Sequence, residues 1–199
     1  MRNIFISLFL LISFNVSAQN DEERWVDSVF NSLTLEQRVG QLFNLRANDP
    51  NKDFNTYIDD YIERYNIGGV TFFRTDAEKL LTKANEWQAK SQTPMMIAMR
   101  INDGISYPYQ MTLGAVTNDS LIAEMGRQIA EQCTRIGINV NFAPTVDVNN
   151  EPNNPVIGFR SFGENADNVA RKGLAYAMAL QDNGVLPSMK HFPGHGNTM

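Results

Sequence analysis

The sequence is poor in cysteine and in runs of basic residues. A single cysteine, Cys133, excludes an intramolecular disulfide, so the stability of the chain must come from its core. Cys133 falls within an apolar helical pattern, which favours a buried small side chain over a reactive thiol. Acidic residues outnumber basic ones by 22 to 17, and no basic run is present. The electrostatic footprint of a nucleic-acid-binding protein is therefore missing, and no nucleic-acid partner is expected.

Only one apolar run is long, and it is too short to remain in a membrane. It covers residues 4–14 behind Arg2, and Val16-Ser17-Ala18 follows with the small residues that signal peptidase prefers. A membrane-spanning helix needs about 20 apolar residues. The sequence therefore predicts a signal peptide over residues 1–18 with cleavage near Ala18. We expect an exported protein, periplasmic or secreted, with no permanent membrane anchor.

The rest of the chain, residues 19–199, has no repeat, low-complexity tract or long linker, so we expect one domain. Within it, helical patterns alternate with short apolar runs. Three helices are expected to end at a glycine and pass at once into a strand, at Gly68, Gly137 and Gly184. Other predicted features are a capping box at residues 34–37, a helix over 77–90, helix starts at Asn118 or Asp119 and near Asn165, and strands over 41–45, 70–73, 95–99, 138–143 and 185–190.

Strands that alternate with helices of this length predict an α/β fold with parallel pairing through right-handed crossovers. About five strand-helix units are expected. Two architectures fit them: an open doubly wound sheet, which the pattern alone favours, and the first part of an eightfold barrel. In both, residues at the carboxyl ends of the strands face one common site.

Several polar residues follow the predicted strands and are candidates for that site. Residues 44–48 follow the first strand, Arg100 follows the third, Asp147 follows the fourth, and Lys190-His191 end the fifth. The guanidinium and ammonium groups are donors that suit ligand hydroxyls. Structural alternatives remain open for two of them: Arg100 as a solvated surface residue, and Asp147 as a cap on the backbone of Asn149-Asn150.

Arg160 belongs to a long connection over residues 144–164, in which prolines, glycines and asparagines indicate an irregular loop suited to binding. Its guanidinium could reach the same rim. The alternative is a surface ion pair with Glu164 or Asp167.

The two histidines of the chain, His191 and His195, are four residues apart, a spacing that binds zinc on a helix. Pro193 and its neighbouring glycines prevent a helix there, and no cysteine is nearby, so no metal site is predicted. Residues 192–196 also lack the spacing and the following helix of a phosphate-binding loop. No cofactor is expected.

The segment Lys190-His191-Phe192-Pro193-Gly194-His195-Gly196 resembles the signature loop of the N-terminal barrel domain of family 3 glycoside hydrolases, in the bacterial β-N-acetylhexosaminidase branch. The similarity extends from about residue 33 to residue 199, with supporting stretches at 39–43, 141–148 and 160–163. The resemblance implies a TIM-type (β/α)8 barrel, of which the chain would hold about the first five strand-helix units, an incomplete barrel. It reverses the preference for an open sheet.

The resemblance also implies a reaction, the retaining hydrolysis of a terminal β-linked N-acetylhexosamine through a covalent intermediate on an aspartate. By this similarity Arg160, Lys190 and His191 hold the hydroxyls of the sugar, and Arg100 matches a further arginine of the family. His195 is expected to shape the loop. The implied ligand is a glycan that contains N-acetylhexosamine.

The family's aspartate nucleophile lies on a later strand, and its acid/base histidine, paired with an aspartate, follows the signature loop. Neither matches a residue of this sequence, so no catalytic residue is assigned. We expect these 199 residues to be inactive alone, with the C-terminal part of the barrel as a partner. Two departures from the family are a shorter segment after residue 99 and Asn197 in the place of an aspartate.

Three functions are weighed. The leading interpretation is a fragment or degenerate copy of an exported glycosidase. The alternative is a non-catalytic exported sugar-binding module that keeps Arg160, Lys190 and His191. A flavodoxin-like nucleotide binder would need a phosphate-binding loop after the first strand, and residues 44–48 are a poor candidate for one.

Overall fold

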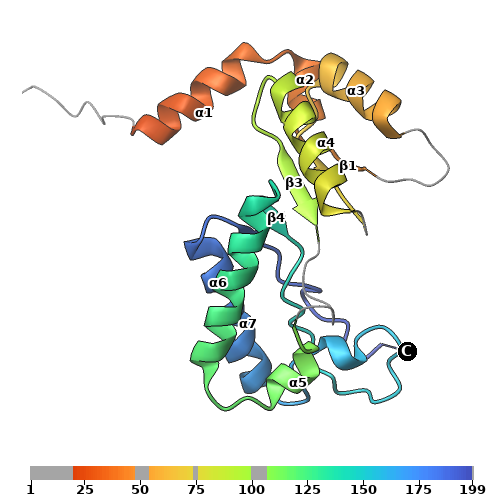
Figure 1. Cartoon of the computed structure of the whole chain (residues 1–199), viewed down its shortest axis with the longest axis vertical. Coiled ribbons are helices and arrows are strands. Elements are labelled where there is room, and N and C mark those ends of the chain that lie inside the picture. Colours follow the sequence, from red (N-terminus) through yellow and green to blue (C-terminus); the bar gives the residue numbers. More distant parts are fainter. Residues whose placement is uncertain (1–19, 48–53, 74–75, 100–106, 199) are drawn as a thin grey trace, which may run out of the picture.

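The computed structural model describes residues 20–47, 54–73, 76–99 and 107–198 (Figure 1). The expected signal peptide over residues 1–18 lies outside the described residues. Within the described ranges, no helix has both the length and the apolar character needed to cross a membrane.

A single parallel sheet forms the centre of the fold. Its strands lie in the order β1-β2-β3-β4-β5, so each strand pairs with its neighbours along the chain. A doubly wound sheet reverses its strand order at a switch point. Consecutive order with right-handed crossovers instead places the helices on one side of a curving sheet, as in the wall of a barrel. The sheet is open, which agrees with an incomplete barrel. The strands are β1 (Asn44–Arg46), β2 (Gly69–Thr71), β3 (Met96–Met99), β4 (Val140–Asn141) and β5 (Leu186–Pro187).

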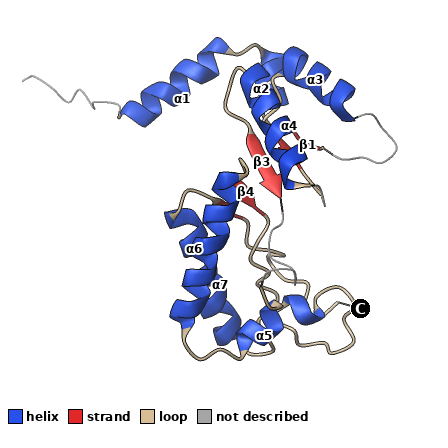
Figure 2. Cartoon of the chain, viewed as in Figure 1, coloured by secondary structure: helices blue, strands red, loops and turns tan. Residues whose placement is uncertain are grey.

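Helices connect the strands, and several begin where the sequence predicts (Figure 2). Thr34 and Gln37 form the expected capping box, and Asn165 caps its helix by accepting a hydrogen bond from the Asn168 amide at 2.9 Å. Asn118 accepts from the Ser120 amide at 3.0 Å. The helices are α1 (Asp21–Ser32), α2 (Leu35–Gly40), α3 (Phe54–Tyr65), α4 (Ala77–Lys90), α5 (Gln110–Gly114), α6 (Asp119–Arg135) and α7 (Ala166–Asp182), with a 3-10 turn, η2 (Gly158–Arg160).

Two of the three expected glycine helix ends are confirmed. Gly137 and Gly184 have φ angles of 78° and 81°, in the left-handed region that glycine adopts without strain. At the third, the prediction for Gly68 is wrong, because Asn66 takes the left-handed position with φ of 48°. Gly68 serves a different purpose: a Cβ there would stand 2.0 Å from the carbonyl oxygen of Gln41.

The predicted strands are longer than the observed ones, and the first is misplaced. Gln41 is the C-cap of α2, and the amides of Leu42 and Phe43 still bond to carbonyls of that helix, so β1 begins only at Asn44. The fifth strand covers two residues, although a parallel bridge between Thr145 and Lys190 continues the pairing beyond it.

The core lies between the sheet and its helices. Val70 and Ile97 of the sheet are fully buried against helix side chains, and the ring of Phe72 stacks on Trp87 of α4 with centroids 5.7 Å apart. Cys133 of α6 belongs to this core, as the sequence predicts, and burial raises the pKa of its thiol to about 12.

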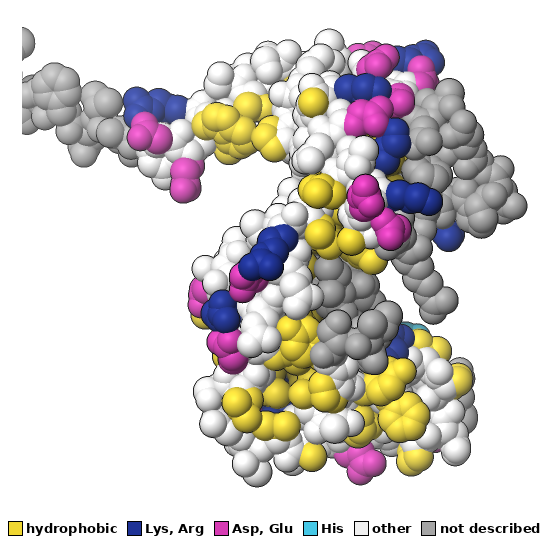
Figure 3. Space-filling view, in the orientation of Figure 1, with side chains coloured by type: hydrophobic (Ala, Val, Ile, Leu, Met, Phe, Trp, Pro, Cys, Tyr) yellow, Lys and Arg dark blue, Asp and Glu magenta, His cyan; other side chains and the backbone are white. Residues whose placement is uncertain are grey.

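The opposite face of the sheet is exposed in part: Ala98 and Val140 on it are buried, whereas the side chains at its two margins are exposed among the described residues. Side chains alternate between the two faces of a strand, so Met96 and Leu186 point away from the helix-facing row that contains Ile97. Met96 is 44% exposed and Leu186 is 55% exposed. A second apolar surface lies along α1, where Trp25, Val26 and Phe30 are exposed (Figure 3).

Candidate functional site

Lys190 lies at the start of a loop over residues 190–196, beyond the end of β5. Its backbone pairs with the chain that follows β4: the Lys190 amide donates to the Pro144 carbonyl at 3.1 Å, and the Val146 amide donates to the Lys190 carbonyl at 2.6 Å. The ammonium group donates to the carbonyl of Phe142 at 2.5 Å. Lys190 therefore lies at the carboxyl end of the sheet, where the sequence places it.

Asp147 anchors the 190–196 loop. Its carboxylate is buried, and one oxygen accepts from the His191 amide at 3.1 Å and contacts His191 Nδ1 at 2.7 Å. The other oxygen accepts from the His195 amide at 2.7 Å. The side chain of Asp147 does cap backbone amides, as one alternative predicted, but these amides belong to the 190–196 loop. The prediction of Asn149-Asn150 as the capped residues is wrong.

The far end of the loop is packed closely against the segment after β4. A Cβ on Gly196 would stand 1.7 Å from the Val148 carbonyl oxygen, so only glycine fits there. Asn154 donates to the carbonyl of His195 at 2.7 Å, and the ring of His195 hydrogen-bonds the hydroxyl of Thr198. The rings of His191 and His195 meet edge to face with centroids 5.6 Å apart.

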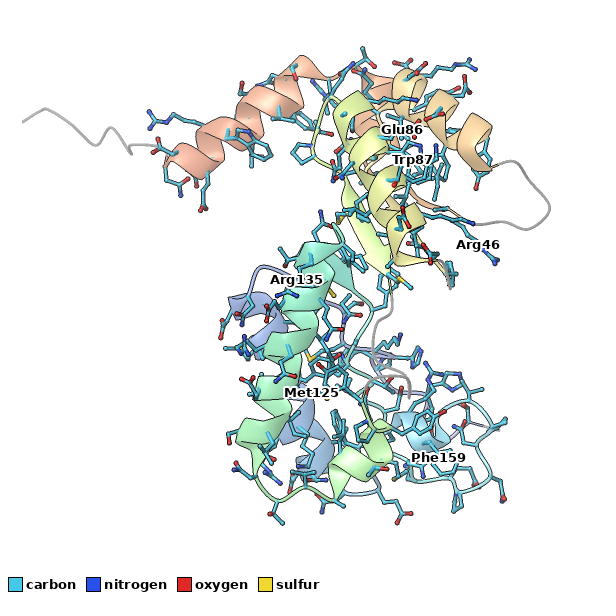
Figure 4. All side chains as sticks on the ribbon, in the orientation of Figure 1. Arg46, Glu86, Trp87, Met125, Arg135 and Phe159 are labelled. Atoms are coloured by element: carbon cyan, nitrogen blue, oxygen red, sulfur yellow. The ribbon has the colours of Figure 1, made fainter. Side chains whose placement is uncertain are left out.

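Arg160 ends the 3-10 turn η2, and its neighbour Ser161 ties this segment to the same anchor. The Ser161 hydroxyl donates to the backbone carbonyl of Asp147 at 2.6 Å. The Arg160 guanidinium donates to the Val156 carbonyl at 2.9 Å. Within the described part of the chain it forms no ion pair with Glu164 or Asp167, so the surface-pair alternative is not what the structure contains. Figure 4 labels the neighbouring Phe159, which belongs to the same 3-10 turn.

Three buried polar atoms of this region have no hydrogen-bond partner among the described residues: Thr145 Oγ1, Asn149 Oδ1 and Arg160 Nε. Buried donors and acceptors are nearly always paired, because leaving one unpaired costs free energy. All three belong to the segment that follows β4 and borders the 190–196 loop.

Two other predicted site positions are not brought into this cluster. Arg100 lies outside the described residues. Asn44, from the 44–48 segment, accepts a hydrogen bond from Thr71 of β2 at 2.5 Å, which ties it to the neighbouring strand. The described residues contain no group of three histidine, cysteine or acidic side chains that could hold a metal ion.

Sequence reasoning missed how much the site depends on its supports. Asp147 was considered as a site residue at a strand end or as a cap on Asn149-Asn150, and its bonds to the 190–196 loop were not predicted. Asn154, Ser161 and Gly196 were not assigned a role. The one available signal was the position of Asp147 directly after a predicted strand. The choice of its partners depends on the fold.

The family model "Glycosyl hydrolase family 3 N terminal domain" matches residues 34–199. The chain belongs to this family. This family 3 domain is 41% identical over 162 residues to Beta-hexosaminidase A of Pseudoalteromonas piscicida. The aligned region covers 71% of this chain and 27% of that protein. The resemblance in the 190–196 loop thus identified the family correctly.

Solved structures agree with the family 3 fold. A β-N-acetylglucosaminidase from Paenibacillus sp. str. FPU-7 superposes with a TM-score of 0.73 at 34% identity, over 82% of this chain and 34% of that one. NagZ from Neisseria gonorrhoeae, in complex with N-trifluoroacetyl-D-glucosamine, gives a TM-score of 0.59 at 30% identity over 66% of this chain and 45% of that one. The chain thus spans less than half the length of each of these three relatives.

Proposed function

We propose that this family 3 domain binds a terminal β-linked N-acetylhexosamine as part of a β-N-acetylhexosaminidase. The names of the relatives support this substrate class, since one is a β-hexosaminidase and another was solved with an N-acylated glucosamine. The observation that carries the proposal is the convergence on Asp147: its carboxylate holds the loop of Lys190 and His191, and its carbonyl holds the segment of Arg160.

The proposed sugar contacts are hydrogen bonds to hydroxyl groups. Arg160, Lys190 and His191 are each partly exposed while their backbones are tied down, so they can contact a ligand without first being ordered. The partly exposed guanidinium of Arg160 has more N–H donors than its hydrogen bond to the Val156 carbonyl uses, so it can donate to a sugar hydroxyl. Arg100 is proposed as a further contact by family resemblance alone.

We further propose that these 199 residues bind the sugar without hydrolysing it. Retaining hydrolysis needs two catalytic groups that flank the glycosidic bond. The nucleophile and acid/base of the family match no residue of the chain, so turnover would need a polypeptide that supplies the later strands of the barrel as a partner.

Calorimetry with N-acetylglucosamine tests the proposal. We expect saturable binding to the purified chain, weaker binding of glucose, and loss of binding in Arg160→Ala. Arg135→Ala is the matched control, because Arg135 is an exposed arginine paired with Glu131 on α6. Absence of binding to the unaltered chain, or equal losses in the two variants, would contradict the proposed site.

An aryl N-acetyl-β-glucosaminide tests the second part. We expect no release of the aryl group by the 199-residue chain. Clear hydrolysis that copurifies with the chain would overturn the proposed inactivity.

A non-catalytic sugar-binding module is the second candidate function. It is favoured by Asn197, an uncharged residue that by family resemblance replaces an aspartate at the start of the acid/base loop. Fusion of the chain to the later barrel strands of a relative separates the two candidates. Hydrolysis by the fusion supports the enzyme. If the fusion binds the sugar without hydrolysing it, and the substitution Asn197→Asp restores hydrolysis, the result supports the module.

We also propose that the protein is exported, on the evidence of residues 1–18 in the sequence. Mass spectrometry of the protein recovered outside the cytoplasm is expected to give a chain that begins near residue 19. Recovery of the uncleaved chain in the cytoplasm alone would contradict export.

A further inference from the structure

We propose that Asp147 is a positioning residue that fixes both the orientation and the tautomer of the His191 ring for sugar binding. This inference rests on the proposed function, because it concerns how that same site presents one of its contacts.

The geometry gives Asp147 two separate tasks on one loop. Its two oxygens accept from the backbone amides of His191 and His195, at 3.1 and 2.7 Å, and these bonds hold the course of the loop. The contact of 2.7 Å with His191 Nδ1 is a third interaction, and it acts on the ring alone. Loop shape and ring orientation are therefore set by the same carboxylate.

Burial makes the contact directional. The side chain of Asp147 is 0% exposed and that of His191 is 36% exposed. The Nδ1 edge of the His191 ring therefore contacts a buried acceptor, while part of the ring is open to solvent. Hydrogen bonds that involve an ionised group are stronger than neutral ones, and a low local dielectric strengthens them further. The ring is thereby fixed at one edge while its other edge stays accessible.

The chemistry of the pair decides what the accessible edge offers. An ionised carboxylate can only accept, so His191 Nδ1 carries the proton, and the Nε2 of a neutral ring is an acceptor. A sugar hydroxyl can then donate to His191 while it accepts from a neighbouring cationic side chain. With the opposite tautomer, Nε2 would become a donor, and the site would present donors alone to the sugar.

Long-range proton-nitrogen correlation spectra of the full chain, recorded at a pH where the rings are neutral, read the tautomer directly. The chain has only two histidines, so the variant His195→Gln assigns the spectrum. We expect His191 to be protonated at Nδ1. Protonation of the neutral ring at Nε2 would overturn the proposal in the unaltered chain, whether or not any variant folds.

The variant Asp147→Asn supplies the second arm. Its amide group can place a donor against Nδ1, so we expect the tautomer to change and the affinity for N-acetylglucosamine to fall by about tenfold, the loss of one charge-assisted hydrogen bond. Ser161→Ala is the matched control: it removes a bond to the Asp147 carbonyl and leaves the carboxylate unchanged, so the tautomer should not change.

The outcomes separate the two proposals. If the unaltered chain binds no sugar but His191 is protonated at Nδ1, the proposed function fails while the geometry of the pair stands. If Asp147→Asn changes the tautomer and leaves sugar affinity unchanged, the positioning role is overturned while the proposed function stands. An equal change of tautomer in Ser161→Ala would show a general effect of loop structure and would also overturn the positioning role.

Discussion

The α-carbon of Gly196 lies so close to the carbonyl oxygen of Val148 that an added Cβ would be 1.7 Å from it. We expect Gly196→Ala to push the 190–196 loop away from the segment after β4. The variant should lose about 1–3 kcal/mol of stability, as overpacked sites do, and should lose N-acetylglucosamine binding. Urea denaturation and calorimetry measure the two effects. The neighbouring variant Asn197→Ala, at an exposed position, should leave stability unchanged; equal stability of both variants would contradict the close contact.

Asp119 makes the stability of the α6–α7 pair sensitive to acid. The hydrogen bond from the buried Lys172, aided by the charges of Lys172 and Arg171, lowers the pKa of the Asp119 carboxyl below its ordinary value. A carboxyl whose pKa is lower in the folded than in the unfolded state contributes its full stabilisation at a pH above the unfolded-state pKa. This stabilisation is lost as the pH falls through the folded-state pKa. We therefore expect Asp119→Asn to flatten the dependence of stability on pH below about pH 4. Urea denaturation over a pH series checks this, and an unchanged slope would contradict it.

Cys133 should not react in the folded protein. The thiol is fully buried in the core and its pKa is raised to about 12, so the reactive thiolate is scarce at neutral pH. We expect no labelling by a thiol reagent under native conditions and complete labelling in urea. Rapid labelling of the native chain would show that the core between α6 and the sheet opens readily.

The exposed position of Leu186 on the sheet should tolerate polar substitution. Leu186 is 55% exposed, so Leu186→Thr should change stability by less than about 0.5 kcal/mol. We expect it to reduce the binding of a hydrophobic dye. Ile97→Thr is the opposite case, because Ile97 is fully buried toward the helices and a hydroxyl there should cost about 1–3 kcal/mol. Similar stability losses in both variants would indicate that the face around Leu186 is covered.

Helix boundaries were predictable from sequence where the signal is local. Thr34, Asn118 and Asn165 each cap their helix through an amide two or three residues away, so the sequence pattern contains the complete interaction. The left-handed Gly137 and Gly184 are equally local, because backbone freedom belongs to the residue itself. The parallel sheet followed from the alternation of these elements.

Boundaries that depend on distant contacts were not predictable. Gly68 is required because the backbone of Gln41, at the end of α2, lies too close to leave room for a Cβ. The left-handed residue that follows α3 is Asn66 and not Gly68. The side chain of Asn66 is buried and bonded to Thr93, a contact that no local pattern contains. Strand order also depends on tertiary pairing, and only the family resemblance favoured the barrel.

The places of the candidate residues in the fold were predictable from the sequence, but the residues that support them were not. Lys190 and His191 stand at a strand end and within a recognisable loop, and Arg160 lies in an irregular connection. The partners of Asp147, by contrast, are 44 and 48 residues away in the sequence. An aspartate after a strand has many possible partners, and only the pairing of β4 with β5 brings this one to His191.

Because each strand pairs with the one before it, the sheet can grow in the order in which a ribosome delivers the chain. The loop at residues 190–196 can take its folded course only after the segment that follows β4, because its anchor at Asp147 must already be in place. During synthesis the strands β1 to β4 would therefore form before the contacts of this loop.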